Sequence, residues 1–257
     1  MSITENRFLW YTVGMSDAIF YAVGIGAGDP ELLTVRAVRV LDGCDVICFP
    51  ETGRGDDTRH LAYDAVCGAV DMRGKETVFC PVPMTRDREK TAAAYALIAD
   101  SCAAFLRQGK RVAFVSLGDV SLYATAAHVA ERVRAAGFPV QFVAGVHSFS
   151  AAACAASVSL CGRDECATII PADAYFSAGK LETALRADGT KILMKAGRHL
   201  RGIIALIDEC GLLADTVLVQ RASLPGQRVL CGAALRDAGD ELFRDAYLSV
   251  VIVGGAR

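Results

Sequence analysis

The sequence predicts an α/β protein of two domains, because short apolar segments of strand length alternate with longer segments of helical pattern. The chain has 257 residues, which is enough for one large domain or for two domains of about 100–130 residues each. In the first half the alternation is regular, and this predicts a mostly parallel sheet. In the second half the predicted strands continue, but the helices between them are shorter.

The first half is predicted to contain five strands, at 20–23, 45–50, 77–82, 111–117 and 140–143. Helices are expected after the first strand, at 90–106 and at 122–136. Gly137 is placed to end the last of these helices, because glycine commonly follows the final helical residue.

The second half is predicted to contain five more strands, at 167–171, 190–195, 216–221, 228–233 and 248–253. The stretch 171–179 is the most loop-like. We place the domain boundary near Ser150, within a helix expected at 148–157, which divides the chain into domains at 19–150 and 151–257. Residues 1–18 form an N-terminal extension, and translation starts either at Met1 or at Met15.

Composition excludes several functional classes. The formal net charge of −2 offers no basic face for nucleic acid. No apolar run reaches the roughly 18 residues that a membrane span needs, and the N-terminus lacks the features of a signal peptide. We therefore expect a cytoplasmic protein without nucleic-acid or membrane partners.

The ten cysteines do not form a metal-binding pattern, because no two of them are separated by only two residues. Several, such as Cys48, Cys80 and Cys154, lie among apolar residues, where a free thiol behaves as a small hydrophobic group. The four histidines are scattered along the chain. No metal site is expected.

The segment 20–34 reads Phe-Tyr-Ala-Val-Gly-Ile-Gly-Ala-Gly-Asp-Pro-Glu-Leu-Leu-Thr. Gly24, Gly26 and Gly28 remove three side chains in five positions, so that the backbone can turn sharply and approach a ligand. Asp29 suits an N-cap, and Pro30 suits the first helical position. The pattern predicts a ligand cradle at the C-terminal end of a strand.

The spacing of the glycines limits which ligand this cradle can bind. A dinucleotide-binding fingerprint requires a third glycine at the position of Asp29, and a phosphate-binding P-loop requires Lys-Ser/Thr after the last glycine. NAD binding is therefore a disfavoured alternative, and a purely structural turn is another.

Four further segments follow predicted strands. They read Leu117-Gly-Asp-Val-Ser-Leu-Tyr123, Val143-Ala-Gly-Val-His-Ser-Phe-Ser150, Ile192-Leu-Met-Lys-Ala-Gly197 and Val219-Gln-Arg-Ala-Ser-Leu-Pro225. With the glycine segment, and in this order, they resemble the motifs of the tetrapyrrole methyltransferases, which use S-adenosylmethionine. The resemblance implies two α/β domains with a cofactor cleft between them, the class III methyltransferase fold.

The resemblance also implies which residues form the site. The expected cofactor contacts are Gly26, Ala27, Gly28, Leu117, Gly118, Asp119, Leu122, Tyr123, His147, Ser148, Met194, Ala222 and Ser223. The candidates for a catalytic base are Tyr123, His147 and Lys195. Ala27, Val120, Ala144 and His147 depart from the family pattern, which leaves a non-catalytic tetrapyrrole- or adenosylmethionine-binding protein as an alternative.

One stretch points to a subfamily. Phe79-Cys-Pro-Val-Pro-Met-Thr-Arg-Asp87 is similar to a segment of the carbon-20 methyltransferases of cobalamin biosynthesis. The resemblance implies methylation of precorrin-2 or its cobalt complex at carbon 20, with another corrin-ring carbon as the alternative, and it implies a homodimer. Because the macrocycle carries carboxylates, we expect arginines to bind it. The candidates are Arg54, Arg59, Arg86, Arg198 and Arg221.

Overall fold

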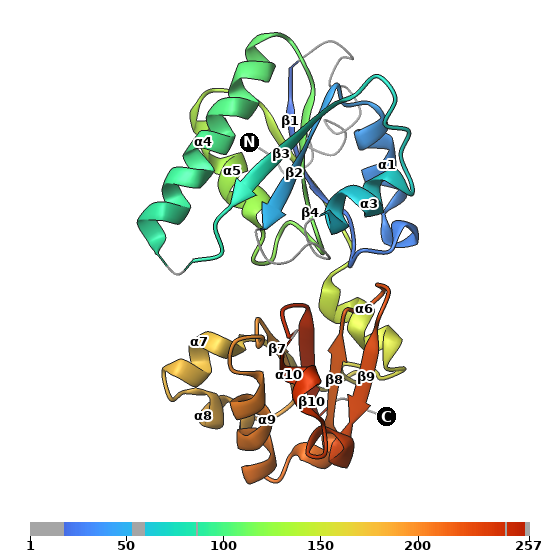
Figure 1. The fold of residues 1–257 in the computed structure, drawn as a ribbon, viewed down its shortest axis with the longest axis vertical. Coiled ribbons are helices and arrows are strands. Elements are labelled where there is room, and N and C mark those ends of the chain that lie inside the picture. The colour runs from blue at the N-terminus through green and yellow to red at the C-terminus, as the bar shows by residue number, and fades with distance from the viewer. Residues whose placement is uncertain (1–17, 53–59, 86, 245, 255–257) are drawn as a thin grey trace. The chain divides into compact units, whose positions relative to one another are not determined.

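The computed structural model describes residues 18–52, 60–85, 87–244 and 246–254. The chain divides into two compact units, the first ending at Val146 and the second beginning at His147 (Figure 1). Ser150, where the sequence places the domain boundary, lies within helix α6 (Ser148–Ala155) of the second unit.

The first unit is built on a five-stranded sheet with the order β3-β2-β4-β1-β5. The strands are β1 (Phe20–Gly24), β2 (Val46–Thr52), β3 (Glu76–Val82), β4 (Val112–Ser116) and β5 (Val140–Val143). Every neighbouring pair is parallel, as the alternation of strands and helices predicts. The C-terminal ends of all these strands therefore lie at one edge of the sheet.

Helices cover both faces of this sheet, which is why its strands are almost continuously apolar. The helices are α1 (Val35–Asp42), α3 (Leu61–Cys67), α4 (Arg88–Arg107) and α5 (Thr125–Ala135). α4 and α5 pack on one face, in a core with Phe20 and Phe114, and α1 and α3 pack on the other, with Val23 and Phe49 (Figure 1).

The first helix differs from the prediction of one continuous helix after Asp29. A single 3-10 turn, η1 (Pro30–Leu32), is capped by Asp29, whose carboxylate accepts from the backbone N–H of Glu31. The chain is then extended at Leu33, and α1 starts afresh after Thr34. Thr34 is a second N-cap, and a residue with the extended backbone of an N-cap cannot continue a preceding helix.

The second unit contains a mixed sheet with the order β6-β7-β10-β8-β9. The strands are β6 (Ala167–Pro171), β7 (Thr190–Met194), β8 (Thr216–Gln220), β9 (Arg228–Cys231) and β10 (Ser249–Val253). β6 and β7 are parallel, whereas β10 is antiparallel to both β7 and β8, and β8 is antiparallel to β9. β6, β7 and β8 therefore run in the same direction and end at the same edge.

The helices of this unit are short apart from α9. They are α6, α7 (Ala172–Ser177), α8 (Leu181–Leu185), α9 (Leu200–Glu209) and α10 (Asp240–Arg244), with 3-10 turns η2 (Leu213–Asp215) and η3 (Gly232–Leu235). Leu200, Ile203 and Ile207 of α9 fill the core beneath the sheet. The prediction of a loop at 171–179 was wrong, because α7 occupies most of it and ends before Gly179, whose φ is 66°.

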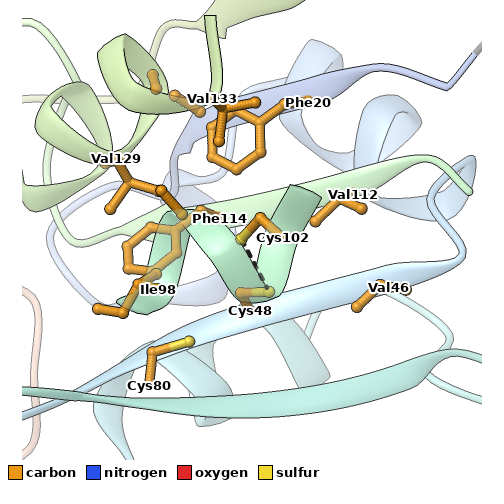
Figure 2. Close-up of a cluster of buried hydrophobic side chains, with 14 of the residues drawn as sticks. Phe20, Val46, Cys48, Cys80, Ile98, Cys102, Val112, Phe114, Val129 and Val133 are labelled. Atoms are coloured by element: carbon orange, nitrogen blue, oxygen red, sulfur yellow. Dashed lines mark hydrogen bonds between the residues drawn. The ribbon is translucent and has the colours of Figure 1, made fainter. Parts of the chain in front are cut away.

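Three thiols lie in the core of the first unit, where β2, β3 and α4 meet (Figure 2). The Sγ atoms of Cys48 and Cys102 are 3.9 Å apart, and Cys80 lies beside them. Contact with the other two thiols, together with burial, raises the pKa of Cys48 well above its usual range.

Among the described residues no group of His, Cys, Asp or Glu side chains is arranged to hold a metal ion. Over the same residues, no helix is long and apolar enough to cross a membrane.

Candidate functional site

Three glycines at or just after the ends of neighbouring strands of the first unit touch through their backbones. β1 lies between β4 and β5, and Gly24, Gly118 and Gly145 end or follow these three strands. A Cβ atom on Gly24 would lie 2.7 Å from the Gly145 nitrogen and 2.8 Å from the Gly118 oxygen. A Cβ atom on Gly145 would lie 2.3 Å from the Gly118 oxygen. No side chain fits at Gly24 or Gly145, because the loops after the three strands pack there backbone against backbone.

The glycine loop after β1 folds against the loop after β4. Gly26 and Gly118 form an isolated antiparallel bridge, with N···O distances of 3.2 and 2.6 Å. Their φ angles are 75° and 78°, in the left-handed region that favours glycine. Ala27 and Gly28 are buried in the same loop. The first two predicted cofactor segments are therefore joined directly through their backbones.

Asp119 holds the loops after β4 and β5 together. Its side chain is buried, and its Oδ2 accepts from the Gly145 N–H at 2.7 Å. Its Oδ1 accepts from the Ser121 N–H at 2.8 Å and from the Ser121 hydroxyl. Both oxygens of the Asp119 carboxylate therefore accept from protein donors. These contacts hold the loops after β4 and β5 in position.

Thr34 ties the start of α1 to the loop after β5. Its Oγ1 accepts from the Ala37 N–H at 3.1 Å and donates to the Ala144 oxygen at 3.1 Å. One hydroxyl therefore both caps the helix and fixes the third loop. Thr34 and Gly145 were missing from the predicted site, although both stand in the motifs, and Gly24 was expected to shape the ligand cradle but was not among the expected cofactor contacts.

Backbone strain marks the predicted segments. Among the described residues, five other than glycine have a positive φ: Tyr123, Ser157, Lys195, Arg221 and Ser223. All but Ser157 lie in segments predicted to bind ligand. A residue other than glycine held in this conformation costs about 1–3 kcal/mol, and such residues cluster at functional sites. The φ of Ser223 is 61°, a value that glycine adopts readily.

In the second unit, the predicted residues gather at the edge where β7 and β8 end. Met194 is the last residue of β7, and the left-handed Lys195 follows it. Desolvation by the surrounding protein lowers the pKa of the Lys195 ammonium, although the residue as a whole is exposed. After β8, the Arg221 N–H donates to the Leu248 oxygen at 2.8 Å and its Nε donates to the Pro225 oxygen at 2.9 Å. The backbone N–H and the side-chain Nε of Arg221 therefore both stabilise the turn that follows β8.

Asp173 and His199 form a pair at this edge that sequence analysis missed. The Asp173 carboxylate accepts from the backbone N–H groups of Arg198, at 3.2 Å, and His199, at 3.0 Å, and its Oδ1 lies 3.2 Å from the His199 Nδ1. The Asp173 N–H donates to the Lys195 oxygen at 3.2 Å. No sequence signal identified Asp173, because its segment was expected to be a loop.

The structure divides the predicted site residues between the two units. The first unit holds Gly26, Ala27, Gly28, Leu117, Gly118, Asp119, Leu122 and Tyr123, and the second holds His147, Ser148, Met194, Lys195, Arg198, Arg221, Ala222 and Ser223. His147 precedes α6, and its ring stacks on Phe149 with centroids 4.8 Å apart. Arg54, Arg59 and Arg86 lie outside the described residues.

Comparisons with known proteins match nearly the whole length of this chain. The family described as Tetrapyrrole (Corrin/Porphyrin) Methylases matches residues 20–235. A cobalt-precorrin-2 C(20)-methyltransferase of Salmonella typhimurium is 30% identical over 225 residues, 86% of this chain and 90% of that protein. A probable cobalt-precorrin-2 C(20)-methyltransferase of Methanocaldococcus jannaschii is 30% identical over 236 residues, 91% of this chain and 94% of that protein.

Solved structures of similar fold include a cobalt precorrin-4 methyltransferase, with a TM-score of 0.66 and 20% identity over 93% of this chain and 96% of that one. A uroporphyrin-III C-methyltransferase of Thermus thermophilus, solved with S-adenosyl homocysteine, has a TM-score of 0.60 and 21% identity, covering 91% of this chain and 96% of that one. Taken with the family match over more than half of the sequence, these findings show that the chain belongs to the tetrapyrrole (corrin/porphyrin) methylase family.

Proposed function

We propose that the protein is an S-adenosylmethionine-dependent C-methyltransferase that methylates precorrin-2, or its cobalt complex, at carbon 20. The observation that carries this proposal is the glycine edge of Gly24, Gly118 and Gly145, which is built from the family's motif segments. The relatives named cobalt-precorrin-2 C(20)-methyltransferase, which match at 30% identity, favour this macrocycle and this carbon.

The loops of the first unit fit the cofactor because small residues let the ends of three neighbouring strands meet backbone to backbone, which places main-chain groups of the motif segments together. Gly26, Ala27, Gly28 and Gly118 would hold it mainly through backbone groups, and Met194, Ala222 and Ser223 are the expected contacts from the second unit. When bound, S-adenosylmethionine supplies an electrophilic methyl group on a sulfonium. The protein has to align the substrate and exclude water, and positioning of this kind contributes about 7–11 kcal/mol in well-oriented reactions.

Methylation at carbon 20 also requires loss of the proton on that carbon. Tyr123, His147 and Lys195 are the candidate bases. Desolvation lowers the pKa of Lys195, although the residue as a whole is exposed, so the three candidates stand equal.

The peripheral carboxylates of the macrocycle call for cationic partners. Arg198 and Arg221 lie at the strand-end edge of the second unit, and Arg54, Arg59 and Arg86 remain candidates from sequence alone. Pairs of guanidinium and carboxylate exposed to solvent are screened over about 8–10 Å at physiological ionic strength. Substrate affinity should therefore fall as salt rises, whereas cofactor binding by backbone groups should change less.

We further propose that the protein is a homodimer. The exposed positions of α4 include Ala92, Ala93, Leu97 and Ala104 among charged residues, and Leu97 is 72% exposed. Small and apolar residues on a helix surface allow close packing across a two-fold axis. Sedimentation equilibrium should give twice the chain mass of 27.2 kDa, and a mass of one chain at micromolar concentration would refute the dimer.

Label transfer tests the function. The protein is incubated with S-adenosylmethionine labelled in its methyl group and with either metal-free or cobalt-loaded precorrin-2. We expect the label in the macrocycle with at least one of the two substrates, and tight binding of S-adenosyl homocysteine in calorimetry. Tight binding of NAD without binding of S-adenosylmethionine would refute the cofactor, and binding of both ligands without transfer would refute the catalytic role.

A further inference from the structure

The second unit contains a cavity of about 260 Å³ at the start of α9. Its walls include Phe176 of α7, Phe243 of α10, and Arg198, His199 and Arg201 at the beginning of α9. It is therefore lined by two guanidinium groups, an imidazole and two aromatic rings. Arg198 is the one residue of this lining that the sequence predicts as part of the site.

The charges around the cavity leave one cation uncompensated. Arg201 pairs with Asp240 and stacks over the Phe243 ring, with its guanidinium carbon 4.1 Å from the ring centroid. His199 lies against Asp173. Among the described residues, none forms an ion pair with the Arg198 guanidinium, although the Arg198 backbone N–H is bound by Asp173. A ligand with one negative charge would therefore balance the charge of the Arg198 guanidinium.

Hydrogen bonds and ring contacts position the residues around the cavity. Asp173 fixes the backbone at Arg198 and His199, and the Phe176 ring packs against His199 with centroids 5.4 Å apart. A Cβ atom on Gly202 would lie 2.7 Å from the Phe176 ring, so glycine is what allows this ring to sit against α9. The direction of α9 adds a partial positive charge at its first turn.

Size and lining together define the ligand. Cavities for whole drug-sized molecules measure about 300–1,000 Å³, so this one suits a side arm of a macrocycle or a small acid. Phe176 and Phe243 suit methylene groups, and a guanidinium suits a carboxylate, which it can bind through two parallel hydrogen bonds. A phosphate dianion would bring more charge than Arg198 alone compensates.

We propose that this cavity binds one carboxylate arm, and that the arm belongs to the macrocyclic substrate. This inference rests on the proposed function for the source of the arm. The carboxylate chemistry itself rests on Arg198 and the two aromatic walls. Arg198 acts here as a binding residue for the periphery of the substrate.

The test compares the wild-type protein with Arg198→Gln and with the control Arg186→Gln. Arg186 lies on α8 in the same unit, pairs with Glu182 at the surface and does not line the cavity. Precorrin-2 affinity is measured by absorbance, S-adenosyl homocysteine affinity by calorimetry, and unfolding by urea. We expect Arg198→Gln to weaken precorrin-2 binding about tenfold to hundredfold, as the loss of one charge-assisted hydrogen-bonding pair would. Arg186→Gln should leave all three measurements unchanged.

Two further probes test whether the loss of precorrin-2 affinity in Arg198→Gln depends on a carboxylate of the substrate. With the fully esterified macrocycle, wild type and Arg198→Gln should bind equally, because no carboxylate remains to lose its partner. Propionate should shift the NMR signals of the Phe176 and Phe243 rings in wild type and not in Arg198→Gln. Equal precorrin-2 affinity in wild type and Arg198→Gln would overturn the proposal while leaving methyl transfer intact.

If wild type fails to bind precorrin-2, the proposed function falls, and the propionate titration then decides the cavity. Shifts that depend on Arg198 would support a carboxylate site that takes a small free acid. An absence of such shifts would overturn the site as well.

Discussion

Glycine is required at Gly24 by contact with neighbouring backbone. Gly24 is followed by a buried loop and faces two other strand ends, and backbone atoms cannot move aside as a flexible side chain can. Overpacking at such a place typically costs about 1–3 kcal/mol.

Gly24→Ala should therefore reduce the free energy of unfolding by about 1–3 kcal/mol and weaken S-adenosyl homocysteine binding at least about tenfold, because the strand ends must separate. Urea denaturation and calorimetry measure the two effects. Gly239→Ala is the matched control, since a Cβ atom there has no neighbour within 4 Å. Normal cofactor affinity in Gly24→Ala would show that the ligand lies elsewhere.

Asp119 needs both of its oxygens as acceptors. Asn has one acceptor oxygen, so in Asp119→Asn an N–H group would face either Gly145 or Ser121. We expect a loss of about 2–3 kcal/mol in stability, the range for hydrogen bonds to a charged group left without a partner. Asp87→Asn is the control, because Asp87 caps α4 from an exposed position and Asn caps as well as Asp. Equal stability of the two variants would contradict this role for Asp119.

The sequence predicted the site residues that stand in motifs. It did not predict which residues they contact in the folded protein. Gly26, Gly28 and Gly118 were expected to shape the ligand loops, and the structure gives each a positive φ. The partners of Asp119 and Thr34 were not predictable, because Gly145 and Ala144 are distant in sequence and meet them only in the folded sheet. Asp173 and His199 had no local signal at all.

At the scale of elements, the capped start of α1 connects helix and ligand loop. Thr34→Ala should cost about 1 kcal/mol of stability, as the loss of an N-cap does, and should also weaken cofactor binding by releasing the loop at Ala144. Thr34→Ser keeps the hydroxyl and should retain both properties. Urea denaturation and calorimetry on the two variants give the comparison. If Thr34→Ala loses stability and binds cofactor normally, the link to Ala144 has no role in the site.

Strands were predicted better than helix boundaries, because a buried strand is a short and continuous apolar run. α5 begins three residues later than expected, since Tyr123 adopts a left-handed conformation that a helix cannot contain. The mixed character of the second sheet was also missed. Only seven residues separate β8 from β9, which is too short for a parallel crossover and could have indicated the antiparallel pair.

At the scale of the whole molecule, the burial of each cysteine can be compared with the reactivity of its thiol. Cys44, Cys48, Cys80 and Cys102 are buried in the first unit, and burial raises the pKa of Cys44 to about 12. Cys67, Cys154, Cys161, Cys166 and Cys231 are exposed, and Cys210 is intermediate. The thiolate is the reactive form, so a raised pKa protects Cys44 and Cys48, and lack of access to solvent protects all four buried thiols.

A thiol-specific colour reagent at pH 8 should therefore react quickly with five or six thiols of the native protein and with all ten after unfolding. Cys102→Ala should remove one slow thiol and leave the number of fast ones unchanged. Rapid reaction of all ten in the native protein would contradict the core in Figure 2.

The most direct test of the central claim is the position of the transferred methyl group. The protein is supplied with precorrin-2 and with S-adenosylmethionine carrying ¹³C in its methyl group, and the product is examined by NMR. The account predicts one ¹³C methyl group bonded to carbon 20, with loss of the proton that this carbon carried. A methyl group on any other ring carbon, or an unlabelled macrocycle under conditions where both ligands bind, would contradict it.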